Sequence, residues 1–595
     1  MKRAIATLTL TALIAACATP AVDEVLVDGG QSITSAWDED YGKPVLGVPA
    51  RSDSDSQKFD SAKGIKGPLG QTNPEYAVWE LRNQWHDTDS ADARAAGMAW
   101  GENSGLTWDE KYAAWIDSME KLQINQWRST FWMTTPEGKK LQAPELECAE
   151  TSLFLRITFA SWYGLPFYIS AADGSTMMHF GHFGVYLNNG PDPRFSRYAT
   201  RYTDHSGLSA EDALANWPTD TKLAGRKLTP RGDDLNEWMG DNAYAGQYFD
   251  QTFLNKRVGH FLMVALTFTG SMHLASHWNT FNVKAPAIRP GDTLLQRWQR
   301  QGIGHTLVVK HVAPVEGFDD KLNAEAISGS MPRRQPVWAT AAGSKSYFTA
   351  KKSGGAGDSF NDGPYAGLGG GLKRWRTATI VDGRWRNIVA PSETANWINH
   401  NDQEAIAERV QIFETLLGAP TPESQLEAAI AVIQAKRDHL RSSPASCSAR
   451  IGREEAFAKL YEVTSEHFNM TREDADLQYR MLEDYVFAEL TYEQSRTCCW
   501  NSTTPEMFDV VMDLAQTTLY DDETETCNEP PVFMMENAGY ERFAAHADAM
   551  GIGDRWVEWS ADESCPQAVT VETDTIAEAA ITPYCTIRPF EAGVE

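Results

Sequence analysis

The chain has 595 residues and a formal net charge of −28 at pH 7. Such an acidic excess argues against nucleic acid as a partner, because binding phosphates requires a basic face. The length predicts two or three domains, and beyond the N-terminal segment no apolar stretch is long enough to span a bilayer.

The N-terminal segment has the pattern of a secretory signal. Residues 1–16 begin with two basic residues and continue in a short apolar run that ends at Cys17. The stretch "IAAC" resembles a bacterial lipoprotein cleavage box, which implies cleavage before Cys17 and a lipid on its sulfur. Ala18 resembles the outer-membrane rather than the inner-membrane pattern. We therefore expect an outer-membrane lipoprotein of the cell envelope, attached to the membrane by its lipid, with residues 17–70 as a flexible tether.

One segment has the properties of a nucleophile on a helix. In "ECAETSLFLRITFASWYGLPF", apolar residues recur at helical spacing from Cys148, and Gly164-Leu165-Pro166 ends the helix. A helix N-terminus lowers the pKa of a thiol, and its backbone N–H groups can hold an oxyanion. The neighbouring Glu145, Glu147 and Glu150 disfavour the thiolate, so a histidine would have to supply most of the activation.

A candidate partner occurs in "RPGDTLLQRWQRQGIGHTLVV". His305 heads an alternating run that predicts a strand, with Leu307, Val309 and His311 on the same face. A histidine on an apolar face is either a hydrogen-bonded core residue or half of a catalytic pair.

Together the two segments resemble the NlpC-type cell-wall endopeptidases of the papain-like superfamily. The resemblance implies an α+β, papain-like domain over residues 71–400, with a helix-borne cysteine, antiparallel strands and a long insertion at 168–285. It also implies an envelope-anchored cysteine peptidase or amidase that cleaves amide bonds, with cell-wall (peptidoglycan) peptides as substrates and no cofactor. Two features depart from the family and put the substrate in doubt more than the chemistry: Glu-Cys-Ala-Glu replaces Asp-Cys-Ser-Gly, and 157 positions separate Cys148 from His305.

Three further residues complete the predicted site. In papain-like enzymes a polar group on the next strand orients the histidine, and Asn323 and Glu325 are both suitably spaced. Gln142 lies six positions before Cys148, which resembles the spacing of the oxyanion glutamine in that superfamily.

Two alternatives remain open. His182 and Asp192 follow Cys148 at a spacing that resembles the transglutaminase-like superfamily, which would use the same Cys-His-Asp chemistry for acyl transfer or proteolysis. The second alternative is a catalytically inactive lipoprotein that binds an envelope ligand. Its candidate binding residues come from a local cluster of arginines and tryptophans: Arg333, Arg334, Trp338 and Trp375.

We expect no metal site. His273 and His277 have the i, i+4 spacing of zinc enzymes, but the glutamate general base between them is missing and no third ligand is evident.

The last third of the chain is expected to form a separate domain over residues 401–595. Its sequence is mostly helical in pattern, with Thr421 as a helix cap and Pro422 in the first turn. In an oxidising envelope its cysteines predict disulfides of unspecified pairing. These are Cys447, Cys498, Cys499, Cys527, Cys565 and Cys585.

Overall fold

A computed structural model describes most of the chain. The described residues are 37–38, 43–44, 62–70, 73–96, 103–125, 128–173, 176–187, 189–195, 198–228, 234–297, 304–315, 317–330, 332–350, 353–354, 370–418, 421–442, 444, 446–488, 491–492, 505–521, 523–533, 537–556, 576–577 and 581–588. The predicted lipid attachment at Cys17 and the cysteines at 498, 499 and 565 lie outside these residues. Within these ranges no helix has the length and apolarity needed to cross a membrane.

The described chain is a mixed α+β protein whose sheets are built from antiparallel strand pairs, as predicted. The largest sheet organises the candidate site. Its strands, in spatial order, are β14 (Val337–Ala339), β13 (Phe318–Ser328), β12 (Gly304–Val315), β11 (Thr293–Arg297), β15 (Gly371–Trp375), β10 (Thr280–Val283) and β18 (Trp397–Ile398).

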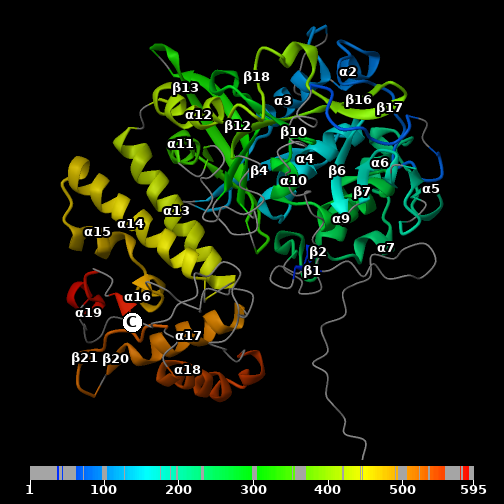
Figure 1. Cartoon of the computed structure of the whole chain (residues 1–595). Coiled ribbons are helices and arrows are strands. Elements are labelled where there is room, and N and C mark those ends of the chain that lie inside the picture. The colour runs from blue at the N-terminus through cyan, green and yellow to red at the C-terminus, as the bar shows by residue number, and fades with distance from the viewer. Residues whose placement is uncertain are drawn as a thin grey trace, which may run out of the picture.

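The two faces of this sheet are covered by different helices. On one face, Val308 and Ile327 join the large aromatic core with α4 (Cys148–Trp162). On the other face, Leu307 and Val309 join a second core with α11 (Ala341–Thr349) and α12 (Gln403–Leu416). Figure 1 shows α11 and α12 on one side of β12 and α4 on the other. The period-2 alternation of strand side chains assigns each residue of β12 to one of these cores.

The body contains further small sheets and helices around α4. The small sheets comprise β3 (Lys121–Gln123), β4 (Ser129–Thr134) and β5 (Lys140–Gln142); β6 (Tyr168–Asp173), β7 (Thr176–Gly181), β8 (Gly184–Leu187) and β9 (Gly190–Pro191); β16 (Thr377–Val381) and β17 (Arg384–Ile388); and β1 (Trp37–Asp38) and β2 (Lys43–Pro44). The helices are α2 (Ala91–Ala96), α3 (Trp108–Ser118), α5 (Tyr198–Arg201), α6 (Ala210–Ala215), α7 (Thr221–Ala224), α8 (Ala245–Thr252), α9 (Lys256–Phe268) and α10 (Ser271–Ala275).

Part of the predicted tether is folded onto the body. The backbone N–H of Gly67 donates to the carbonyl of Trp385 on β17, and Trp385 donates back to Pro68. Val389 donates to the carbonyl of Ala62 in the same way. The prediction of a flexible tether is therefore wrong for residues 62–70, which run beside β17.

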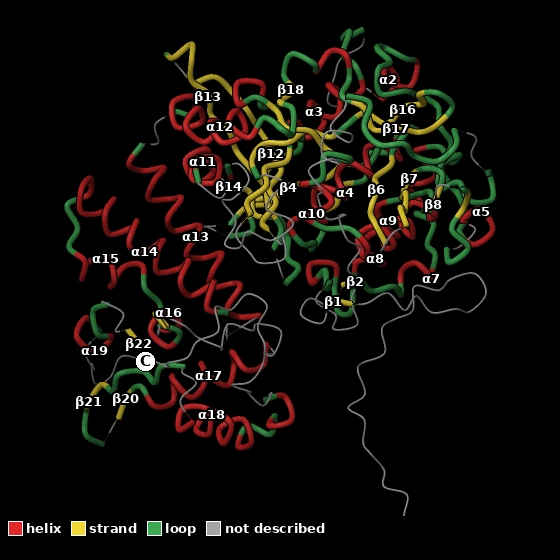
Figure 2. Tube along the Cα trace, in the orientation of Figure 1, coloured by secondary structure: helices red, strands yellow, loops and turns green. Residues whose placement is uncertain are grey.

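The C-terminal part forms a mostly helical module, drawn in yellow to red in Figure 1 and mostly in red in Figure 2. Its helices are α13 (Pro422–Ser442), α14 (Cys447–Phe468), α15 (Arg472–Tyr479), α16 (Leu482–Val486), α17 (Pro505–Thr518), α18 (Asn537–Ala549) and α19 (Tyr584–Ile587). Its short strands are β19 (Thr491–Tyr492), β20 (Tyr520–Asp521), β21 (Thr526–Cys527) and β22 (Ile576–Ala577).

The start of the module is later than predicted. Phe413 and Leu417 of the α12 region pack in the second core of the body, and Arg409 donates to the carbonyls of Val283 and Leu372. The helix α12 therefore belongs to the body, and the predicted boundary at residue 400 is too early. The cap at Thr421 is confirmed, since its Oγ1 accepts the N–H of Ser424 at the start of α13.

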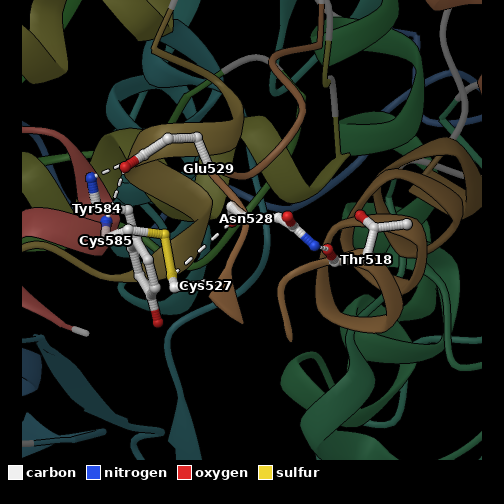
Figure 3. Close-up of a disulfide and its surroundings, with 6 residues drawn as sticks. All are labelled: Thr518, Cys527, Asn528, Glu529, Tyr584 and Cys585. Atoms are coloured by element: carbon white, nitrogen blue, oxygen red, sulfur yellow. Dashed lines mark hydrogen bonds between the residues drawn. A yellow bond between two sulfur atoms is a disulfide. The ribbon is translucent and has the colours of Figure 1, made fainter. Parts of the chain in front are cut away.

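Within the described part of the chain, one of the predicted disulfides is formed: Cys527–Cys585 joins β21 to α19 across 58 positions. Figure 3 shows Glu529 beside this bond, where its carboxylate accepts the backbone N–H groups of Tyr584 and Cys585, each at 2.9 Å. The bond and the carboxylate together hold the C-terminal helix against the β20–β21 hairpin. Cys447 opens α14, and its side chain lies outside the described part of the structure.

Candidate functional site

Cys148 occupies the predicted position at the start of a helix. It is the first residue of α4, and the residue is partly exposed, whereas the twelve residues after it, 149–160, are buried. The helix ends, as predicted, before Gly164, whose positive φ of 61° suits glycine. Cys148 therefore lies at the positive end of a buried helix, where the first backbone N–H groups lack intrahelical carbonyl partners.

The two glutamates beside Cys148 are tied together by a buried arginine. Arg333 forms a fork on Glu150 with N–O distances of 2.7 and 2.8 Å and lies 3.2 Å from Glu147. Glu150 also accepts the backbone N–H of Glu147 at 2.9 Å, which caps the helix. All three side chains are at most 8% exposed. The guanidinium neutralises one of the two charges that would otherwise oppose a thiolate at Cys148.

A third glutamate lies near the start of α4. Burial, reinforced by the neighbouring Glu237 carboxylate, raises the pKa of Glu145 to about 8. Its backbone N–H donates to Asn236, which links the segment before α4 to the 3-10 turn at Glu237–Met239. Glu145 is therefore largely protonated at neutral pH and adds little negative charge near Cys148.

His305 heads β12 as predicted, and its contacts are now defined. Its Nε2 forms a hydrogen bond of 2.8 Å with the hydroxyl of Ser328 on β13. Its ring lies 6.4 Å, centroid to centroid, from the ring of Tyr347 on α11. His305 pairs with Gln296 of β11, and the amide of Gln296 donates to the carbonyl of Tyr347. These contacts place His305 on the face of the sheet that carries α11.

Leu307 and Val309 lie on the same face of β12 as His305, as predicted, and are buried in the core beneath α11. The same prediction is wrong for His311. A bulge between Val309 and His311 shifts the register, and His311 instead contacts Asp117 of α3 at 2.7 Å. A single inserted residue exchanges the faces of all residues beyond it.

Cys148 and His305 lie at the same end of the main sheet. Ser328, which binds His305, is followed by Gly329, whose Cα packs against the backbone just before Cys148. A Cβ at Gly329 would lie 2.2 Å from the carbonyl oxygen of Leu146 and 2.9 Å from the carbonyl carbon of Glu147. The end of β13, which carries the partner of His305, is therefore adjacent to the backbone that leads into Cys148.

The residues predicted to orient His305 do not lie beside it. Asn323 pairs with Ala313 and Glu325 pairs with His311, which are eight and six positions along β12 from His305. At about 3.3 Å per residue these offsets correspond to roughly 26 and 20 Å. The predictions for Asn323 and Glu325 are therefore wrong. Ser328, which the sequence analysis missed, takes the place beside the ring.

Gln142 lies at the end of β5 on the approach to α4. Its side-chain oxygen accepts a hydrogen bond of 3.1 Å from the amide of Gln335, which also donates to the carbonyl of Ala143. Arg334, the neighbour of Gln335, bridges to Leu146 by backbone pairing. Gln142 is thus held at the same end of the body as Cys148, and its role in binding an oxyanion stays a prediction.

The alternative pair of His182 and Asp192 is wrong. The Nδ1 of His182 lies 3.1 Å from the backbone nitrogen and 2.9 Å from the oxygen of Phe167, which follows the C-terminal end of α4. Since α4 has 15 residues, it separates this region from Cys148 by about 22 Å. Burial lowers the pKa of His182 to about 4, and Asp192 pairs with Arg194 at 2.8 Å.

The predicted ligand-binding cluster is also wrong, because its members have structural partners. Arg333 binds the glutamates of α4, as described above. Arg334 donates to the carbonyl of Ala435 on α13, and Trp375 is buried in the large core. Trp338 is 9% exposed, donates from Nε1 to Glu325 at 2.6 Å and lies beneath the ammonium of Lys310 at 4.2 Å. The side chains of Arg333, Trp338 and Trp375 are therefore buried in the interior and do not form a binding surface.

Among the described residues, no group of three or more histidine, cysteine or acidic side chains is arranged to hold a metal ion. His273 uses its Nδ1 to accept the N–H of Gly270 at the start of α10. His277 lies 4.9 Å, ring to ring, from His400. The two histidines of the "HLASH" motif thus have different surroundings.

Comparison of the chain with known protein families, with curated proteins and with solved structures gives no significant match.

Proposed function

We propose that the protein is a cysteine hydrolase that cleaves amide bonds, with Cys148 as its nucleophile and His305 as its base. The observation that carries the proposal is the setting of Cys148: a partly exposed cysteine at the first position of a buried helix, with the flanking carboxylates of Glu147 and Glu150 bound by Arg333. A helix N-terminus favours the thiolate, and an arginine that binds the neighbouring acids removes much of their opposition.

The proposed reaction uses the groups at this end of the sheet. The thiolate of Cys148 attacks the carbonyl carbon, and backbone N–H groups at the start of α4 hold the oxyanion. The C–N bond breaks as the imidazolium of His305 protonates the leaving amine. Water, deprotonated by His305, then attacks the thioester and releases the carboxylic acid together with the thiol. Ser328 holds the ring through Nε2, which leaves Nδ1 as the nitrogen proposed to exchange protons with the thiol, the leaving amine and water.

The remaining parts of the proposal come from the resemblances in the sequence. We propose a papain-like core made of α4 and the main sheet, and anchoring of the chain to the outer membrane through a lipid on Cys17. Peptide bonds of the cell wall are the proposed substrates. An antiparallel sheet packed on a helix that begins with cysteine supports the fold assignment.

The test compares matched variants of the lipid-free protein. Purified cell-wall material is incubated with wild type, Cys148→Ala, His305→Ala and His311→Ala, and newly exposed amines are identified by mass spectrometry. His311 is on the same strand and 42% exposed, which makes it the control. We expect Cys148→Ala and His305→Ala to lower the rate by about 100-fold or more, and His311→Ala to leave it unchanged.

Alkylation of Cys148 by iodoacetamide, followed by pH-dependent mass spectrometry, separates the roles of the two residues. If His305 assists the thiolate, His305→Ala raises the apparent pKa of alkylation. Amide cleavage with an unchanged alkylation profile would exclude His305 as the thiolate's partner. If wild type cleaves no amide but retains cell-wall material equally with Cys148→Ala, the protein is an inactive binding lipoprotein.

A further inference from the structure

The C-terminal module has an open apolar groove far along the chain from Cys148. It lies between α16, α17 and the end of α18, and its volume is about 490 Å³. Its apolar lining consists of Met481, Leu482, Phe508, Met512 and Met550. Arg441 of α13 and Glu483 also line the groove, and these two side chains form an ion pair at 3.1 Å, so the arginine is already neutralised by a carboxylate. Met481 and Met550 are 45% and 39% exposed although both side chains are large and apolar. Exposed methionines around a groove are typical of adaptable binding surfaces, because the thioether chain fits differently shaped partners.

The groove has a regular arrangement along α17. Phe508 and Met512 are four positions apart and line it as an apolar stripe, while Asp509 and Asp513 form a parallel acidic stripe beside them. Asp509 is exposed, and Asp513 is 45% exposed with one oxygen 2.6 Å from Nε2 of His546. An apolar stripe bordered by carboxylates is complementary to a helix with one apolar face and cationic residues at its edge.

The charge of the module excludes several other occupants. Residues 421–595 contain 34 Asp and Glu against 12 Lys and Arg, which accounts for −22 of the chain's −28. A second copy of this module, an anionic membrane or a nucleic acid would meet strong repulsion at this surface. A cationic partner would be attracted to this surface, and its apolar side chains could pack on the exposed Met481 and Met550.

We infer that the groove between α16, α17 and α18 is a docking site for a basic, amphipathic helix of a partner protein. The inference does not depend on the proposed hydrolase activity, because it uses no residue of the body. The apolar face of the partner helix packs on Phe508 and the methionines, and its Lys or Arg side chains pair with Asp509 and Asp513.

The first measurement is a binding titration with the full chain. The probe is a fluorescein-labelled helical peptide of about 18 residues, with leucines on one face and lysines on the other. A matched peptide carries glutamate in place of lysine. We expect saturable one-to-one binding of the lysine peptide that weakens as NaCl rises from about 50 to 300 mM, and no binding of the glutamate peptide. Equal binding of both peptides, or no saturable binding, would overturn the inference.

Variants locate the binding surface. Met481→Lys with Met550→Lys places charge at two exposed groove positions, and we expect affinity to fall at least about tenfold. Leu477→Lys is the control, since Leu477 is 51% exposed on α15 and does not line the groove. Asp509→Lys leaves the apolar lining intact, and it should weaken binding about threefold or more at low salt. Loss of affinity in Leu477→Lys equal to that in the groove variants would refute this site.

Discussion

The ion pairs that flank Cys148 provide the sharpest prediction. Replacing Arg333 with methionine keeps much of the side-chain volume but removes the guanidinium that pairs with both Glu147 and Glu150. The exposed fractions are 0% for Glu150, 8% for Glu147 and 1% for Arg333. Breaking a buried pair by removing one partner costs about 3–5 kcal/mol, because the other charge stays buried and uncompensated. We expect Arg333→Met to lower the free energy of opening α4 by that amount at pH 7.

The assay is hydrogen exchange of the α4 amides, which reports the opening of this helix separately from the C-terminal module. Acidification provides an independent check on the mechanism. Without the guanidinium, burial raises the pKa of the glutamates in the folded state, so the variant regains stability as the pH falls and they become protonated. We therefore expect the deficit of Arg333→Met to shrink between pH 7 and pH 5.

Two further variants complete the argument. In Arg333→Met with Glu150→Gln, one buried charge is also removed, so the double variant should be no less stable than Arg333→Met alone. Arg82→Met breaks an ion pair with Asp92 whose side chains are 55% and 35% exposed, and it should cost less than about 1 kcal/mol. A cost below about 1 kcal/mol for Arg333→Met, or a deficit independent of pH, would refute the reasoning.

Three other predictions follow from single contacts. Gly329→Ala places a Cβ 2.2 Å from a backbone oxygen and should cost about 1–3 kcal/mol in thermal denaturation, whereas Gly207→Ala, with nothing within 4 Å, should cost far less. The pKa of Glu145 is raised to about 8 in the folded protein, so the protonated carboxyl stabilises the fold fully below about pH 4.5, and this contribution is lost as the pH rises through 8. The free energy of unfolding in urea should therefore fall by about 2–3 kcal/mol between pH 6 and pH 8 because of this group. Glu145→Gln should abolish that fall. Replacing Cys527 and Cys585 with serine opens a loop of 58 positions and should destabilise the C-terminal module by about 4 kcal/mol, measured by hydrogen exchange of its helices.

Local signals in the sequence predict the elements that carry the site. The helix from Cys148 is specified by its apolar spacing and by the Gly-Leu-Pro stop, and both features appear in α4. The capping pattern that begins α13 is likewise confirmed at Thr421. These predictions succeed because helix caps and periodicity depend on residues a few positions apart.

Predictions that needed long-range geometry failed for identifiable reasons. Asn323 and Glu325 are wrong because β12 and β13 form a long hairpin, and its register carries both residues away from His305. His182 is wrong because the helix between it and Cys148 is rigid, so a short separation in sequence becomes a long one in space. No local pattern encodes a hairpin register that includes a bulge, and sequence spacing alone does not say whether His182 folds back along α4 toward Cys148.

The charge around Cys148 also depends on contacts between residues that are far apart in the sequence, and it affects the reactivity of the thiol. Its sequence neighbours are three glutamates, which predict a strongly acidic setting that opposes a thiolate. The folded chain brings Arg333 onto two of them from about 180 positions away, and the raised pKa of Glu145 keeps the third largely protonated at neutral pH. Only about one negative charge then remains from these four groups, and the N-terminus of α4 opposes it. The reactivity of the Cys148 thiol therefore depends on the arginine and the proton that the fold brings to the neighbouring glutamates. Alkylation of Cys148 in the Arg333→Met variant measures the contribution of the arginine, and we expect the apparent pKa of the thiol to rise.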